Sequence, residues 1–352
     1  MTDSDYLIRA ARLAARGLGH TRPNPAVGAV IVRDGAIVGE GWHKKCGGDH
    51  AEVSAIKNAM RRGVGSLAGS TIYVTLEPCS RPGRVGACTD AIAEAGISRV
   101  VYAVQDPNPK NRGKAARALA RHGVECERFA GDAGVVADCR SLVAGFRKHV
   151  LTGLPYVTVK IAMSLDGKIC DDRGGSNWIT GESSRRRTNR LRESVDAIMV
   201  GAETVRRDNP SLLARVKPNK DLIRVVVSRS GKLPEDAQVF TDKLNQTLVF
   251  DDAEKALREL GRMGVTSVLC EGGLALARSL ADAGLVDEWI AAIAPVFIGS
   301  KRISSAIRGK TFRGGCFLSD GDSFFTAGLS GFASWSGEGS GMNFGFNGKS
   351  KV

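Results

Sequence analysis

The sequence predicts an α/β protein made of two domains. Its 352 residues exceed the usual length of a single domain. Strand-like and helix-like segments alternate through both halves, which is typical of a central sheet with helices on its faces. The composition, 43% hydrophobic and 25% charged, is that of an ordinary globular chain. We expect one domain over residues 1–150, a second over 151–313, and an atypical segment rich in Gly, Ser and Phe over 314–352.

The first half predicts helices and strands in alternation. In chain order they are a helix over 5–16, strands over 26–32 and 36–41, a helix over 50–62, a strand over 71–76, a helix after Cys88, a strand over 99–104, a helix over 113–121, a short strand near Val124 and a helix over 132–147. The Asp34–Gly35 pair between the first two strands is typical of a β-hairpin. The β-branched content of residues 71–76 indicates a buried strand, and Pro78 ends it.

The second half repeats this pattern after an expected linker at 151–155. The expected strands cover 156–163, 196–201, 223–228, 247–250, 267–270 and 289–297, and the expected helices cover 180–194, 253–263 and 274–283. The strand over 289–297 is the last clear one. From residue 314 onward no period of 2 or 3.6 is evident, and no element is predicted there.

Charge and cysteine usage narrow the possible partners. The formal net charge of +13 favours either nucleic acid or an anionic small substrate. The basic residues are spread out and aromatic content is only 6%, so phosphate-bearing metabolites fit better than nucleic acid. We expect no membrane partner and, because the N-terminus lacks an apolar leader, a cytoplasmic protein. Six scattered cysteines are read as ordinary thiols: Cys46, Cys126, Cys139, Cys170, Cys270 and Cys316.

One ordered set of residues predicts a metal-dependent hydrolase. His50 and Glu52 stand at an expected helix start, Cys79 follows the buried strand, and Cys88 precedes the next helix. One imidazole and two thiolates suit zinc and leave its fourth position open to water, whose pKa zinc lowers. Glu52 can move the proton from this water to a leaving amine. We therefore expect a zinc-dependent deaminase in which His50, Cys79 and Cys88 bind the metal.

The chain also resembles the bifunctional deaminase/reductase of riboflavin biosynthesis. The wide spacing of Cys79 and Cys88, with Gly83–Arg84 between them, is similar to that family. The other matching segments, spread over about residues 5–300, are Pro23–Gly28, Gly39–His43, Thr75–Ser80, Gln105–Pro109, Lys160–Lys168, Ser176–Thr180, Arg207–Pro210 and Glu271–Gly273. The resemblance implies a cytidine-deaminase-like domain followed by a dihydrofolate-reductase-like domain.

This resemblance implies two consecutive reactions with two cofactors. Zn²⁺ would serve the hydrolytic deamination of a 2,5-diamino-6-ribosylamino-4(3H)-pyrimidinone 5′-phosphate, and NADPH would then reduce the ribosyl group to ribityl. The implied substrate contacts are Asn24, His43, Ser176, Arg192, Leu212, Arg215 and Glu271, and the implied cofactor contacts are Met163, Trp178, Thr204, Asp208, Gly273 and Ser279. A homo-oligomer is implied as well. For these positions the resemblance carries the assignment, since a lone Trp or a Gly–Gly turn is usually only structural.

Two departures from the family pattern leave alternatives open. The family shows His two residues after the first Cys and Thr-Pro-Pro before the second, where this chain has Arg81 and residues 85–87. We expect Arg81 to contact the substrate instead. The second departure is the segment from residue 314. The alternatives are a homologue with one inactive half, or a zinc deaminase that acts on nucleic acid, which would need stacking aromatic residues near its pocket.

Overall fold

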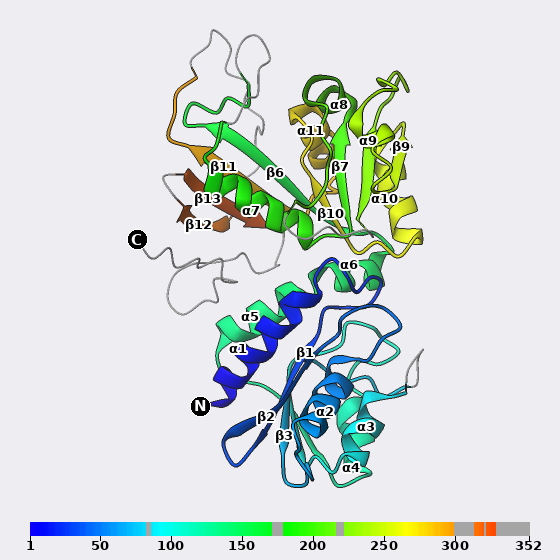
Figure 1. Cartoon of the computed structure of the whole chain (residues 1–352), viewed down its shortest axis with the longest axis vertical. Coiled ribbons are helices and arrows are strands. Elements are labelled where there is room, and N and C mark those ends of the chain that lie inside the picture. The colour runs from blue at the N-terminus through cyan, green and yellow to red at the C-terminus, as the bar shows by residue number, and fades with distance from the viewer. Residues whose placement is uncertain (82–85, 171–178, 216–221, 299–312, 320–321, 329–352) are drawn as a thin grey trace. The chain divides into compact units, whose positions relative to one another are not determined.

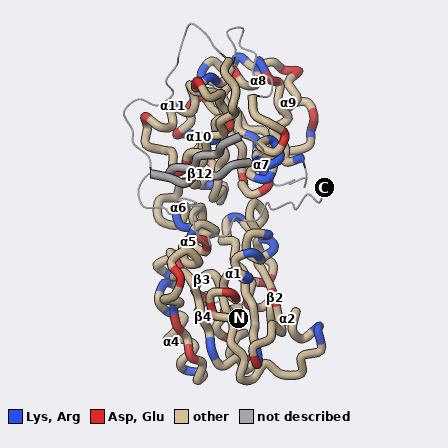
Figure 2. The backbone as a smooth tube through the Cα atoms, turned by 90° about the vertical axis from the view of Figure 1, so that its left-hand side faces the viewer, with Lys and Arg blue, Asp and Glu red and all other residues tan. Residues whose placement is uncertain are grey.

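The structure is a computed structural model that describes residues 1–81, 86–170, 179–215, 222–298, 313–319 and 322–328. The chain divides into two compact units, and the boundary between them lies between Thr152 and Gly153. Each unit is an α/β assembly around one sheet (Figure 1). Basic and acidic residues are interspersed along both units (Figure 2). Within the described segments, no helix combines the length and apolar character needed to cross a bilayer.

The first unit contains a five-stranded sheet with the order β2-β1-β3-β4-β5. Its elements are α1 (Asp3–Ala14), a 3-10 turn (Ala15–Gly17), β1 (Gly28–Arg33), β2 (Ala36–Trp42), α2 (Ala51–Arg61), β3 (Thr71–Leu76), α3 (Cys88–Glu94), β4 (Arg99–Val104), α4 (Ala115–Ala120), β5 (Glu125–Arg128), α5 (Ala133–Leu142) and α6 (Ala144–Thr152). Strand β1 is antiparallel to β2 and β3, whereas β3, β4 and β5 are parallel. The predicted hairpin is confirmed, with Asp34 and Gly35 both at positive φ, as a type I′ turn requires.

Both faces of this sheet are covered, as expected for an α/β domain. Helices α1 and α5 pack on one face, and α2, α3 and α4 pack on the other (Figure 1). Alanines at i, i+4 and i+8 of α2, namely Ala51, Ala55 and Ala59, are fully buried and let this helix approach the sheet closely. At Gly41 of β2 a Cβ atom would lie 2.3 Å from the backbone nitrogen of Ala55. This close contact fixes the start of α2, which carries His50 and Glu52.

The second unit contains an eight-stranded sheet with the order β12-β13-β11-β6-β10-β7-β8-β9. Its elements are β6 (Tyr156–Ser164), α7 (Glu182–Glu193), β7 (Ala197–Gly201), α8 (Ala202–Asp208), β8 (Ile223–Val227), α9 (Gln238–Thr241), β9 (Thr247–Phe250), α10 (Ala253–Arg262), β10 (Ser267–Cys270), α11 (Leu274–Asp282), β11 (Glu288–Ala294), β12 (Arg313–Ser319) and β13 (Asp322–Gly328). The strands from β11 to β9 are parallel, so their carboxyl ends meet at one edge. Helices α10 and α11 share one core with the sheet, and α7, α8 and α9 supply apolar residues to another.

The structure corrects three expectations about elements. The helix expected over 132–147 is two helices, α5 and α6, because the chain leaves helical geometry at Val143. The expected linker therefore begins inside α6, which continues to Thr152. The strand over 289–297 is not the last, because β12 and β13 follow it and β13 pairs with β11 in antiparallel register. The pairing of β13 with β11 accounts for these two strands, which the apolar periodicity of the Gly-rich segment did not predict.

Candidate functional site

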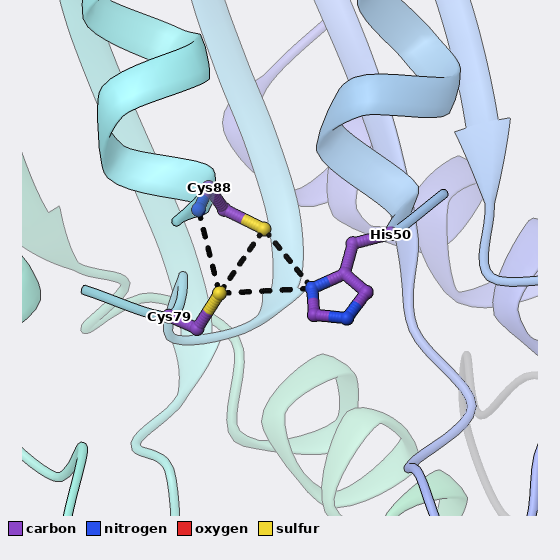
Figure 3. A group of neighbouring side chains, drawn as sticks. All are labelled: His50, Cys79 and Cys88. Atoms are coloured by element: carbon purple, nitrogen blue, oxygen red, sulfur yellow. Dashed lines mark hydrogen bonds between the residues drawn. The ribbon is translucent and has the colours of Figure 1, made fainter. Parts of the chain in front are cut away.

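Three elements of the first unit bring His50, Cys79 and Cys88 together. His50 is the N-cap residue of α2, Cys79 follows the end of β3, and Cys88 is the first residue of α3 (Figure 3). The side chain of His50 caps no backbone N–H, so its Nδ1 atom points at the two sulfur atoms. Within the described residues, these three form the one His/Cys/Asp/Glu group whose ligand atoms all lie within 4.8 Å of one another.

The spacing of these three atoms fits a tetrahedral zinc ion. Bonds of about 2.3 Å to sulfur and about 2.0 Å to nitrogen place two sulfurs about 3.8 Å apart, and a sulfur and a nitrogen about 3.5 Å apart. Here the Sγ atoms of Cys79 and Cys88 are 3.4 Å apart, and His50 Nδ1 lies 3.6 Å and 3.2 Å from them, respectively. A movement of a few tenths of an ångström would therefore accommodate the metal.

Local hydrogen bonds prepare Cys79 to be a thiolate. The backbone N–H of Cys88 donates to Cys79 Sγ at 3.4 Å, and the pKa of the Cys79 thiol is lowered to about 4 by the Cys88 thiol, His50 and this N–H group. The pKa of Cys88 is raised, since its thiol hydrogen-bonds to Cys79 and is buried. The pKa of His50 is raised by its hydrogen bond to Cys79. Because a metal ion stabilises the charged form of its ligands, both thiols would be deprotonated in the zinc-bound protein.

Glu52 lies in the first turn of α2, two residues after His50. Its side chain is almost fully enclosed, with only 3% of the residue exposed. Burial raises the pKa of this carboxyl to about 7, and the nearby negative charge of Cys79 adds to the effect. A carboxyl group whose pKa lies near neutral pH can both accept and return a proton, which is what a general acid–base in a deaminase must do.

Asn24 and His43, for which the family resemblance implies substrate contacts, lie beside this centre. The rings of His43 and His50 meet edge to face with centroids 5.2 Å apart. His43 Nδ1 is 2.9 Å from the carbonyl oxygen of Asp49, which can only accept, so Nδ1 carries the proton. Burial lowers the pKa of His43, and its Nε2 is then free to accept from Asn24 Nδ2 at 3.1 Å. Two polar side chains thus form a fixed wall next to the metal ligands.

A buried network that the sequence analysis missed holds the loop of Cys79. The carboxylate of Glu77 accepts backbone N–H bonds from Asp106 at 3.1 Å, Gly113 at 3.0 Å and Ala115 at 3.2 Å. Asn111 Oδ1 accepts from the N–H of Ser80 at 2.8 Å. The segment after β4 is therefore bonded to the residues on both sides of Cys79. The signal available in the sequence was Glu77 itself, an acidic residue at the end of an apolar strand.

In the second unit, two predicted substrate residues bind each other. Arg192 of α7 and Glu271 after β10 form a bidentate ion pair, with Nε to Oε1 at 2.6 Å and Nη2 to Oε2 at 3.0 Å. The pKa of Glu271 is lowered by the Arg192 charge, against the opposing effect of burial. Burial lowers the pKa of the Lys160 ammonium group on β6, and its charge also interacts with the charges of Glu271 and Arg192. A lysine within the apolar strand 156–163 was the sequence signal for this third charge.

The segment with Leu212 is held by two arginines. Leu212 is buried and has a left-handed backbone conformation (φ 51°), which is unfavourable for a leucine. On one side Arg224 Nη1 donates to the carbonyl of Ser211 at 3.2 Å, and on the other Arg192 Nη1 donates to the carbonyl of Leu213 at 3.2 Å. The Arg224 side chain is only 1% exposed and is anchored by Asp242. Arg215, at the end of this segment, is exposed.

The predicted cofactor residues gather at the carboxyl ends of neighbouring parallel strands. Met163 lies near the end of β6, Gly273 follows β10, and Gly201 at the end of β7 begins α8. Helices α8 and α11 both begin at a glycine with no side-chain cap, and a Cβ atom on Gly273 would meet open space. Uncapped helix N-termini at this edge suit the phosphates of a dinucleotide.

The remaining predicted positions are only partly placed. Thr204 and Asp208 lie on α8, with Asp208 exposed, and Ser279 lies on α11. Arg81 is exposed at the end of the described part of the Cys79 loop. Ser176 and Trp178 lie outside the described residues.

Comparison with known proteins gives the same division of the chain. Residues 1–104 match the family model for the cytidine and deoxycytidylate deaminase zinc-binding region, and residues 155–316 match the RibD C-terminal domain. The riboflavin biosynthesis protein RibD of Actinobacillus pleuropneumoniae is 40% identical over 88% of each chain. That of Escherichia coli K12 is 36% identical over 85% of this chain and 89% of its own.

Solved structures agree with these relatives. A diaminohydroxyphosphoribosylaminopyrimidine deaminase/5-amino-6-(5-phosphoribosylamino)uracil reductase from Thermotoga maritima superposes with a TM-score of 0.82 at 33% identity, covering 93% of this chain and 98% of its own. Acinetobacter baumannii RibD (form 1) gives a TM-score of 0.76 at 31% identity with the same coverage.

Fold and site together define a two-unit enzyme, a zinc-dependent deaminase followed by an NADPH-dependent reductase. The chain belongs to the RibD family of riboflavin biosynthesis proteins. The predicted fold classes of both halves and the predicted cofactors, zinc and NADPH, are thereby confirmed. A deaminase acting on nucleic acid is not favoured by these relatives.

Proposed function

We propose that His50, Cys79 and Cys88 hold the zinc ion and that Glu52 moves the proton during deamination. The substrate is 2,5-diamino-6-ribosylamino-4(3H)-pyrimidinone 5′-phosphate. The observation that carries this proposal is the close His/Cys/Cys group with a buried carboxyl two residues along the same helix. Zinc, when bound, supplies a Lewis acid that activates water.

The residues of the chain then perform the proton movements. A carboxylate oxygen of Glu52 takes a proton from the attacking water and delivers it to the amino group, whose bond to the ring carbon breaks to release ammonia. Asn24 and His43 hold the pyrimidine ring beside the metal ligands. The water oxygen remains on the ring carbon, so the product is the corresponding uracil derivative.

For the second step we propose that the product binds between α7 and the segment with Leu212. Ser176, Arg192, Leu212, Arg215 and Glu271 are the proposed substrate contacts. NADPH would lie against Met163, Trp178, Thr204, Asp208, Gly273 and Ser279. NADPH, when bound, would supply a hydride for the ribosyl carbon. The bond from this carbon to the ring oxygen would break, and that oxygen would take a proton from water, which gives the ribityl group. The ion pair of Arg192 and Glu271 with the neighbouring Lys160 supplies a charged wall for this site.

The test measures the two half-reactions separately in one preparation. We expect Glu52→Gln to lower ammonia release by about 10²–10⁴-fold while zinc content and NADPH oxidation with the deaminated substrate stay unchanged. Cys88→Ser should lose zinc as well as ammonia release. Full deaminase activity in Glu52→Gln would contradict the assigned role. Ammonia release by the unaltered protein without NADPH oxidation would favour the alternative of an inactive second half.

We also propose a homo-oligomer, which sedimentation velocity of the zinc-loaded protein would reveal. The contact of Arg81 with the substrate phosphate is proposed on its position next to Cys79 and on its exposure. The cytoplasmic location expected from the N-terminal sequence stays a prediction.

A further inference from the structure

The first unit contains a cavity of about 550 Å³ separate from the zinc ligands. It lies between the loop that follows β2 and the outer surface of α2, and neither His50 nor Glu52 lines it. Cavities of roughly 300–1,000 Å³ are the size that holds small organic ligands. The cavity is therefore large enough for a mononucleotide.

The charged side chains that line this cavity are mainly basic. Lys44 and Lys45 come from the loop, and Lys57 and Arg61 come from α2. The one acidic residue in the lining, Asp49, is bound by Lys57, whose Nζ lies 2.8 Å from both carboxylate oxygens. In the part of the chain that the structure describes, Lys44, Lys45 and Arg61 form no ion pair. Three positive charges therefore face the cavity without a carboxylate, which favours an anionic ligand.

The cavity also offers an apolar surface next to these charges. Trp42 lines it and is partly exposed, and Lys44 Nζ lies 4.9 Å from the centre of the Trp42 ring. Met60, on the outer face of α2, is 46% exposed and also lines the cavity. An indole and a thioether beside basic side chains that form no ion pair within the described segments suit a ligand that carries both a planar ring and a phosphate.

We propose that this cavity binds a phosphorylated compound with a planar ring, of the size and chemistry of a nucleoside monophosphate. The ring would lie against Trp42 and Met60, and the phosphate would contact Lys45, Lys57 and Arg61. This site is distinct from the zinc centre, which takes the deaminase substrate.

One residue connects the cavity to the catalytic centre. The carboxylate of Asp49 is held by Lys57 in the cavity wall, and its backbone carbonyl accepts the hydrogen bond from His43 Nδ1 at 2.9 Å. A phosphate in the cavity competes with Asp49 for Lys57. We infer that occupancy shifts Asp49 and with it His43, so that ligand binding changes the KM of deamination.

The binding test uses AMP as the probe, with adenosine and inorganic phosphate as its separate parts. Calorimetric titration uses the zinc-loaded full chain without NADP⁺, and the Lys45→Gln/Arg61→Gln double variant, titrated alongside, reports AMP binding at the deaminase and reductase sites. We expect saturable AMP binding with a Kd below about 1 mM, and binding at least about tenfold weaker for each part alone. Absence of saturable binding by AMP would overturn the proposal.

Variants place the bound probe in the cavity. Lys45→Gln and Arg61→Gln should each raise the Kd for AMP about tenfold, the loss expected for one charge-assisted hydrogen bond. Arg117→Gln is the matched control, because Arg117 is an exposed arginine on α4 of the same unit and does not line the cavity. Unchanged AMP binding in the Lys45→Gln/Arg61→Gln double variant would refute the site.

Two further measurements separate the parts of the proposal. AMP should change the KM of deamination in the unaltered protein and not in the double variant, and an unchanged KM would refute the connection through Asp49. Sedimentation of Met60→Glu tests the other possible occupant, a second copy of the chain. A change of oligomeric state with AMP binding intact would identify this surface as a contact between copies and overturn the ligand proposal.

Discussion

Replacement of Glu77 should weaken both the fold of the first unit and its hold on zinc. In Glu77→Gln the remaining carbonyl can accept the two N–H groups that now bond to Oε2, from Asp106 and Gly113, but as a neutral acceptor. The new amide group then faces the N–H of Ala115 and leaves it unpaired. One unpaired buried N–H costs about 1–3 kcal/mol, and each bond that changes from charged to neutral loses roughly 1 kcal/mol. The sum is about 3–5 kcal/mol.

This loss is a large part of the 5–15 kcal/mol that typically stabilises a domain. Glu77→Ala removes all three bonds and should leave the first unit largely unfolded. In Glu77→Gln we expect a folded protein whose zinc affinity falls about 10–100-fold, because the loop of Cys79 loses part of its support. The affected loop carries Cys79, one of the three zinc ligands. Zinc should therefore be released at a lower urea concentration than that at which the first unit unfolds.

The assay follows urea denaturation, zinc competition with a chelator, and both half-reactions. NADPH oxidation by the second unit is the internal control and should be unchanged. Glu94→Gln is the matched variant, since Glu94 is an exposed acid on α3, and its effect should stay within about 0.5 kcal/mol. A Glu77→Gln protein with the stability and zinc affinity of the unaltered chain would refute the reasoning.

Three other predictions concern the second unit. Asp242→Asn leaves the buried Arg224 without its carboxylate and should cost about 3–5 kcal/mol in urea denaturation. Arg224 lowers the pKa of Asp242 in the folded protein below its unfolded value of about 4. The stabilisation by this ion pair is therefore present above pH 4 and should be lost as the pH falls through the folded pKa. Acid titration of the unaltered protein and of Asp242→Asn checks this. Burial raises the pKa of Glu288, so its ionised form costs stability as the pH rises from the unfolded value of about 4.3 through the folded pKa. Glu288→Gln should therefore raise the Tm at pH 7 and raise it much less at pH 4, and an equal rise at both would contradict this. Removal of residues 313–352 exposes β11 as a sheet edge and should abolish NADPH oxidation while ammonia release persists, as paired assays would show.

The zinc centre could be predicted from the sequence because each ligand lies at a boundary of an element. A strand of β-branched residues that ends at Leu76, two residues before Pro78, locates Cys79, and the helical spacing after His50 locates Glu52. These are local signals, readable from a few residues each. The network of Glu77 was not predictable in this way, since its carboxylate bonds to residues 29, 36 and 38 positions away.

The missed elements have different physical reasons. The break at Val143 does not itself fall on a Pro or Gly, and the nearby Gly145 lies within α6, so a periodic pattern continues across the break. The hairpin of β12 and β13 did carry a signal, because Asp320–Gly321 separates the two strands just as Asp34–Gly35 separates β1 and β2. However, the two strands lack apolar alternation. They form because β13 pairs with β11, and this long-range contact exists only in the folded sheet.

The pairing of Arg192 with Glu271 changes how the second site should be understood. These residues are 79 positions apart, and the family resemblance implied a separate contact with the substrate for each. In the structure the guanidinium of Arg192 reaches Glu271, which directly precedes the glycines that begin α11, and also the carbonyl of Leu213. One planar side chain with several donors in fixed directions thus ties the residues before α11, on the proposed cofactor side, to the Leu212 segment, on the proposed substrate side. Lysine has a single ammonium group and could not make both contacts in this geometry. The position therefore needs an arginine, and not only a positive charge, to hold the two sides of the proposed reductase site together.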